Sequence, residues 1–92
     1  MTYVYLMNNH KELTFDIIQK HVDHLKKLDK EGKLVLCGPF TDFPRGMVVF
    51  NADSKEEAKE IAEADPFISS GCKTYELRRL EVASAENHYL LS

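Results

Sequence analysis

The chain has 92 residues and a mass of 10.6 kDa, enough for one small domain with a single core. Hydrophobic residues make up 43% and charged residues 29%, which excludes the disordered, collagenous and disulfide-rich classes. The net charge of −3 disfavours sequence-independent binding to nucleic acid or to an anionic membrane, and no apolar stretch approaches the roughly 20 residues that span a bilayer.

The first expected strand covers 3–7, a segment rich in aromatic and β-branched residues that precedes the turn-forming pair Asn8-Asn9. A helix is expected to begin after Thr14, a good N-cap, and to end at Gly32. Between them, apolar residues recur every three or four positions, as on the buried face of a helix. This stripe consists of Phe15, Ile18, Val22 and Leu25.

Two fully apolar runs follow, at 34–37 and 47–50, and they predict strands that are covered on both faces and paired as an antiparallel hairpin. Ser54 and Glu57 have the spacing of a capping box, which predicts the start of a second helix. Segment 73–80 alternates apolar and polar residues, as a strand with one solvated face does. The expected order is therefore β-α-β-β-α-β.

This order predicts an α+β fold of the ferredoxin-like type, in which a four-stranded antiparallel sheet carries both helices on one face. The other face would be apolar and uncovered in a monomer, which favours a homodimer formed sheet against sheet. The tail, 81–92, ends in Tyr89-Leu90-Leu91. It is expected either to lie across the neighbouring subunit or to fray.

The two cysteines, Cys37 and Cys72, are not part of a C-x-x-C motif. The first residues of the chain lack the basic and long apolar segments of a secretory signal. We therefore expect a reducing, cytoplasmic environment in which both cysteines act as small buried hydrophobic residues.

His21 and His24 lie three residues apart on the first predicted helix and share one of its faces. Such a pair can bind a metal, but a structural metal needs four ligands, and neither His10 nor His88 has a suitable spacing. We expect no metal site. The spacing leaves open whether the two histidines are structural or catalytic.

Asp65-Pro66-Phe67 follows the second predicted helix. Asp is a preferred N-cap and Pro is favoured at the first helical position, so these residues are expected to begin a short turn of helix. In a second, functional interpretation the carboxylate of Asp65 contacts an imidazole of the first helix and orients it as a general base.

RNA-recognition domains share this order of elements and carry stacking aromatic residues on their third strand. Met47 stands where the first of these aromatic residues would be, and the chain is acidic. We therefore expect no nucleic-acid partner. Gly38-Pro39-Phe40 ends the second predicted strand, where loops often line pockets.

Several short motifs occur in a characteristic order along the chain. They are His24-Leu25, Glu31-Gly32-Lys33-Leu34, Gly38-Pro39-Phe40, Ser54-x-Glu56-Glu57-Ala58 and Ala64-Asp65-Pro66-Phe67, with Gly71 beyond them. In this order and spacing the chain resembles the YCII-related (YciI-like) family over about residues 2–80. We expect 1–92 to form one such domain, with a core of about 2–80 and a tail of 81–92.

The resemblance implies a dimeric ferredoxin-like α/β barrel with a cleft between the helices and the sheet of each subunit. It also implies an active site in which Asp65 orients His24, and His24 acts as the general base. The superfamily includes a dehydrochlorinase of chlorinated hydroxyhydroquinone breakdown, and its fold is shared with muconolactone isomerases and small aromatic-ring monooxygenases. A common family pattern has Arg-Pro-Ala before the histidine, where His21-Val22-Asp23 stands here.

The predicted function is cofactor-free proton transfer of the isomerase, lyase or dehydrochlorinase type on a small cyclic or aromatic metabolite. Five residues are expected to line the substrate cleft: Gly38, Pro39, Phe40, Tyr5 and His21. Two alternatives stay open. The chain is a non-catalytic dimeric module that binds a small metabolite or a protein partner in the same cleft, or His24 and Asp65 form a purely structural pair.

Overall fold

The computed structural model describes residues 1–91, and Ser92, the last residue of the predicted tail, lies outside the described residues. The elements in chain order are β1 (Thr2–Asn9), α1 (Phe15–Lys30), β2 (Leu34–Pro39), β3 (Arg45–Asn51), α2 (Lys55–Ala64), α3 (Pro66–Ser69), β4 (Lys73–Leu80) and the 3-10 helix η1 (Ala85–Leu90). The predicted β-α-β-β-α-β order is confirmed, with α3 added as one turn after the second helix. Within residues 1–91, no helix is long and apolar enough to cross a membrane.

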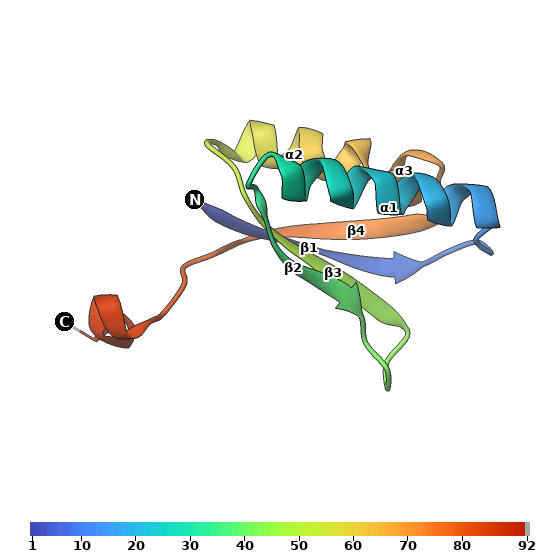
Figure 1. Cartoon of the computed structure of the whole chain (residues 1–92). Coiled ribbons are helices and arrows are strands. Elements are labelled where there is room, and N and C mark those ends of the chain that lie inside the picture. Colours follow the sequence, from blue (N-terminus) through green and yellow to red (C-terminus); the bar gives the residue numbers. More distant parts are fainter. Residues whose placement is uncertain (92) are drawn as a thin grey trace.

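The four strands form one antiparallel sheet in the order β2-β3-β1-β4. Helices α1, α2 and α3 lie on one side of this sheet (Figure 1). This is the ferredoxin-like arrangement expected from the sequence. The central strands are β1 and β3, whereas β2 and β4 form the two edges.

The edge position of β2 corrects one prediction, because this strand is not covered on both faces. Leu36 and Cys37 are exposed in the single chain, so the expectation of a buried cysteine holds for Cys72 but not for Cys37. An apolar run shows that a strand has apolar side chains, but it does not show where the strand stands in the sheet. The covered central strand of the hairpin is β3, in which Val48, Val49 and Phe50 are buried.

The core fills the space between the sheet and the helices. Tyr3, Tyr5 and Met7 alternate along β1 and all point to the helix side, where they meet Val48 and Phe50 of β3. The ring of Phe50 contacts the rings of both tyrosines, with centroid separations of 6.1 and 5.6 Å. These side chains form the core on the helix-covered face of the sheet, which is also the face on which the candidate site lies.

The buried face of α1 differs from the predicted stripe. Phe15 is 82% exposed, although its spacing had placed it in the stripe. Val22 and Leu25 of the predicted stripe are partly buried as expected, and Ile17, His21, His24 and Leu28 are partly or fully buried beside them. Both histidines therefore lie on the covered side of α1 and not on its solvent side.

The helix ends follow the predicted capping residues. The side-chain oxygen of Thr14 accepts a hydrogen bond from the N–H of Ile17, and that of Ser54 accepts one from the N–H of Glu57. After α1, Gly32 adopts a positive φ of 73°, a conformation that glycine reaches without a steric penalty. Local sequence therefore defines where α1 and α2 begin and where α1 ends.

The C-terminal segment runs away from the sheet after β4, and η1 lies apart from the rest of the chain (Figure 1). Tyr89 and Leu91 are 70% and 79% exposed. Three residues of this segment have a positive φ, namely His88, Tyr89 and Leu90. Within residues 1–91, the apolar side chains at the end of the tail are therefore largely exposed to solvent in the single chain.

Candidate active site

Asp65 is the centre of the candidate site and is fully buried. It stands between α2 and α3, and its Oδ1 accepts a hydrogen bond from the N–H of Phe67 at 2.9 Å. Pro66 occupies the first position of α3. The predicted role of Asp65 as an N-cap is thus confirmed.

Two other elements also donate to this carboxylate. The hydroxyl of Tyr5, on β1, donates to Oδ2 at 2.7 Å. The Nδ1 of His21, on α1, lies 2.8 Å from Oδ1 and 2.9 Å from Oδ2. Asp65 therefore contacts an imidazole of the first helix, as the functional interpretation requires, and caps α3 as well.

The histidine in this contact is His21, whereas the family resemblance had pointed to His24. The Nε2 of His24 is buried and has no hydrogen-bond partner among the described residues. The two histidines lie on one side of α1, about 4.5 Å apart along its axis. Which of them reaches Asp65 depends on the axial shift of α1 against α3, which helical periodicity does not define. The predicted contact is corrected accordingly.

Burial and hydrogen bonding set the protonation states of Asp65 and Tyr5. Burial alone raises the pKa of Asp65, but the hydrogen bond and charge of His21, the Tyr5 hydroxyl and the Phe67 N–H outweigh it, so this pKa lies below its usual range. Burial, together with the neighbouring carboxylate, raises the pKa of Tyr5 well above its ordinary value. Asp65 is therefore a carboxylate and Tyr5 a neutral hydrogen-bond donor.

Asp65 contacts the edge of the His21 ring, and Phe67 packs on its face. Its Nδ1 faces Asp65, and the ring stacks on Phe67 with a centroid separation of 3.7 Å and an interplanar angle of 10°. When Nδ1 carries the proton that Asp65 accepts, the neutral ring has its lone pair on Nε2. The side chain is 12% exposed. This arrangement leaves Nε2 as the nitrogen available to a ligand.

A cavity of about 360 Å³ opens beside His21, between α1, the β2–β3 hairpin and Phe67. This volume is within the range of small-molecule sites, about 300–1,000 Å³, and most of the lining is apolar. Of the residues expected to line a cleft, Gly38, Pro39 and His21 do so. Tyr5 is fully buried in contact with Asp65, and Phe40 packs near Phe43 outside this lining.

The lining residues that were not identified as ligand contacts from the sequence include Phe67, Cys37 and Lys73. One signal was present for Lys73, because it shares the helix-facing side of β4 with Tyr75 and Leu77. A lysine on the apolar face of an alternating strand is unusual and indicates a special environment. Although Cys37 is exposed as a residue, partial desolvation of its thiol at the cavity wall raises the pKa of this thiol, which keeps it protonated and weakly nucleophilic.

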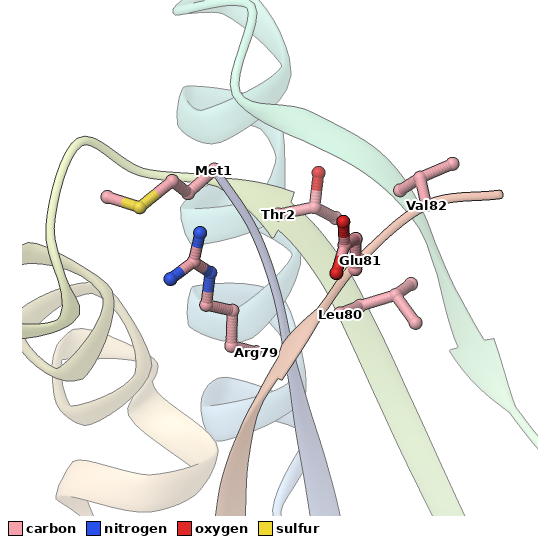
Figure 2. A pocket seen from close by; sticks show the side chains of 6 residues that line it. All are labelled: Met1, Thr2, Arg79, Leu80, Glu81 and Val82. Carbon is pink, nitrogen blue, oxygen red and sulfur yellow. The ribbon is translucent and has the colours of Figure 1, made fainter. Parts of the chain in front are cut away.

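A larger hollow, of about 490 Å³, lies at the opposite end of the sheet, where β4 continues into the tail (Figure 2). It is lined by Met1, Thr2, Arg79, Leu80, Glu81 and Val82. Its charged side chains, Arg79 and Glu81, are exposed to solvent, and no buried ionisable group lies among its lining residues. The smaller cavity beside the buried Asp65 is the better candidate for chemistry.

The described part of the chain contains no cluster of side chains suited to bind a metal ion. Within residues 1–91, no group of three or more His, Cys, Asp or Glu side chains is placed to hold a metal ion.

These features define a small ferredoxin-like protein with a buried His–Asp pair beside a ligand-sized apolar cavity. The family model of the YCII-related domain matches residues 1–81, and the chain belongs to this family, which confirms the resemblance. The chain is 39% identical over 70 residues to the uncharacterized protein YjpA of Bacillus subtilis (strain 168), which covers 76% of this chain and 82% of YjpA.

A solved structure with a similar fold is that of 5-chloro-2-hydroxyhydroquinone dehydrochlorinase (TftG) from Burkholderia phenoliruptrix AC1100, in complex with 2,5-dihydroxybenzoquinone. The TM-score is 0.73 with 19% sequence identity, and the match covers 88% of this chain and 94% of that chain. At this identity the likeness establishes a common fold.

His24 is expected to titrate with a pKa below the ordinary value of about 6.5. Burial lowers this pKa and the charge of His21 lowers it further, while Asp65 and the backbone of Ile61 partly oppose them. Because the folded pKa is below the unfolded one, His24 costs the fold stability as the pH falls below about 6.5. The measurement is an NMR titration of the ring protons, assigned with His24→Gln and with the exposed His10 as reference. An ordinary or raised pKa would contradict burial of the neutral ring.

Proposed function

We propose that this protein is a cofactor-free enzyme in which His21 and Asp65 form an acid–base pair that moves a proton on a small cyclic or aromatic metabolite. The observation that carries the proposal is the 2.8 Å contact between the Nδ1 of His21 and the buried Asp65, at the wall of a ligand-sized cavity. The role of general base, expected for His24, passes to His21 because His21 is the histidine that the carboxylate orients.

In this mechanism Asp65 stays ionised throughout. It accepts the Nδ1 proton of His21, holds the ring in one orientation and stabilises the imidazolium that forms when Nε2 takes a proton from the substrate. The stack on Phe67 limits rotation of the ring. The lowered pKa of His24 keeps that neighbour uncharged, which avoids a second positive charge beside the imidazolium.

Isomerisation and elimination of hydrogen chloride both match these groups, since each needs a base and neither needs an electron acceptor. In an elimination, His21 takes the proton, the electron pair of the broken bond moves into the ring system, and the C–Cl bonding pair leaves with chloride. The product is the substrate less HCl. The common fold with a dehydrochlorinase supports this class of reaction as the first one to test.

The experiment follows chloride release from 5-chloro-2-hydroxyhydroquinone and related halogenated hydroquinones under argon, together with the isomerisation of enol-lactones by NMR. Wild-type protein is expected to convert at least one of these compounds faster than buffer does. His21→Asn is expected to lose this activity, and His10→Asn, at an exposed position outside the cavity, is expected to keep it. If the wild type binds these compounds but converts none, the chain is a binding module and the enzyme proposal fails.

We also propose that the uncovered face of the sheet forms a homodimer, with Val4, Leu6 and Leu36 on the side opposite the helices. Leu36 is 52% exposed in the single chain. Sedimentation equilibrium is expected to give twice the chain mass, and Leu36→Asp to give a monomer, because a charge at this face opposes burial. Lys59→Asp, on the exposed side of α2, is the control. A monomeric wild type would contradict the proposal.

We also propose that the protein works in a reducing, cytoplasmic environment. Cys37 and Cys72 are both free cysteines, and neither is placed in a disulfide. Free thiols persist where cellular reductants are present.

A further inference from the structure

Lys73 lies in the wall of the same cavity, beside the proposed base. It begins β4, and its half-buried side chain is on the helix side of the sheet. Its Nζ lies 4.6 Å from the centroid of the Phe67 ring. The imidazole of His21 stacks on that same ring, so the ammonium group and the proposed base both lie against Phe67.

Lys73 is the one lining residue of this cavity with a permanent positive charge, since the other ionisable lining residues are His21 and Cys37. Within residues 1–91 the structure gives it no carboxylate partner, whereas Lys20 and Lys33 each form ion pairs with carboxylates. Asp65 does not fill this role, because three protein donors already occupy its oxygens.

An ammonium group without a partner in an apolar wall is costly, because burial removes part of its hydration. The pKa of Lys73 reflects this: burial lowers it, and the charge of Asp65 only partly opposes the effect. The cation–π contact with Phe67 uses the charge, but a ring face only partly replaces the anionic partner that the ammonium group lacks. A ligand that brings a negative oxygen to Nζ would supply the missing partner.

We propose that Lys73 selects the charge of the substrate, and that the cavity takes a small flat organic anion whose charged oxygen, a phenolate or enolate oxygen on a ring, lies against Nζ. This inference rests on the proposed function and specifies its substrate class. The ring lies among the apolar lining residues, and its reacting proton faces the Nε2 of His21. When that proton leaves, negative charge grows on the ring oxygens, and the ammonium group stabilises it.

The test measures binding by calorimetry with two probes of nearly the same shape. One is 2,5-dihydroxybenzoquinone, whose hydroxyl groups ionise in neutral water because the charge is shared with the carbonyl oxygens. The other is its reduced form, 1,2,4,5-tetrahydroxybenzene, which has the same ring and the same four oxygens but is uncharged at neutral pH; it is kept under argon. The proteins are wild type, Lys73→Met, Lys73→Arg and the control Lys59→Met on the exposed side of α2.

Wild type is expected to bind the anion more tightly than the neutral probe. Lys73→Met should weaken binding of the anion by about 10- to 100-fold, the loss of one hydrogen bond to a charged group, and leave the neutral probe within about threefold. Lys73→Arg should retain most of the affinity for the anion, and Lys59→Met all of it. Thermal unfolding of each variant checks that the fold is intact.

Three results would overturn the inference: no binding of the anion by wild type, equal affinity of wild type and Lys73→Met for the anion, or an equal loss for both probes. Failure of the proposed function gives a different pattern. In that case the anion binds in a Lys73-dependent way, but neither this chain nor its His21→Asn variant converts any compound of the screen. Turnover of uncharged substrates that Lys73→Met leaves unchanged would support the function and refute the role of Lys73.

Discussion

Replacement of Asp65 by alanine is expected to lower the free energy of unfolding by about 3–5 kcal/mol, the range found when one partner of a buried charged pair is removed. The substitution leaves the Nδ1 of His21, the hydroxyl of Tyr5 and the N–H of Phe67 without their acceptor. These three donors lie on three different elements, so their loss loosens the packing of the helices on the sheet. Urea unfolding at neutral pH measures the change.

The control for this variant is Asp42→Ala, which removes a carboxylate from the exposed hairpin loop and should change the stability by less than about 0.5 kcal/mol. Asp65→Asn adds a test of pH dependence. The pKa of Asp65 is lower in the folded chain, so its ionisation stabilises the fold above the unfolded value of about 3.9, and this stability is lost as the pH falls through the folded value. The difference between wild type and Asp65→Asn should therefore shrink in acid. Similar unfolding of Asp65→Ala and Asp42→Ala would contradict the expectation.

Substitution of His21 by glutamine is expected to lower kcat by about 10²- to 10⁴-fold on whichever substrate the wild type converts, because general-base catalysis contributes this much. His24→Gln should lower kcat by less than about tenfold, since Nε2 of His24 is buried and not oriented by Asp65. Steady-state kinetics of the two variants separates the histidines. The two variants replace the same residue type by glutamine on the same side of α1, so each serves as a matched control for the other.

Two further readouts distinguish chemistry from damage to the fold. Loss of a base should appear in kcat with little change in KM for a substrate held by the apolar wall and Lys73, whereas a distorted cavity should raise KM. Circular dichroism and urea unfolding show whether each variant retains the fold. A large loss of kcat in His24→Gln with near-normal activity in His21→Gln would instead identify His24 as the general base, as the family resemblance implies.

Local signals predicted most of the fold because each depends on neighbouring residues. Thr14, Ser54 and Asp65 cap the helices that follow them, and Gly32 ends α1 through a positive φ. The position of β2 at the sheet edge depends on which strands pair, and an apolar run such as 34–37 carries no information about its neighbours. The exposed Phe15 was misplaced because an apolar residue at the right spacing need not be covered.

The candidate site was only partly predictable for the same reason. Asp65 stands out in the sequence as an N-cap before proline, and the structure adds that the same carboxylate receives donors from β1 and α1. Choosing between His21 and His24 requires the axial position of α1, a property of tertiary packing. Lys73 belongs to the site because β4 places it across from α1, although 52 residues separate it from His21 in the chain.

The meeting of β1, α1 and α3 at a single carboxylate also bears on how such a domain can acquire a new substrate. A substitution at Asp65 that altered the chemistry would at the same time withdraw the acceptor that ties these elements together. We therefore expect substitutions that change ligand preference to occur in the cavity wall, on α1 and on the β2–β3 hairpin. Residues such as Ile18 and Pro39 line the cavity there and make no hydrogen bond to the Asp65 carboxylate. Substitutions in the wall can change which ligands the cavity accepts while the His21–Asp65 contact stays in place.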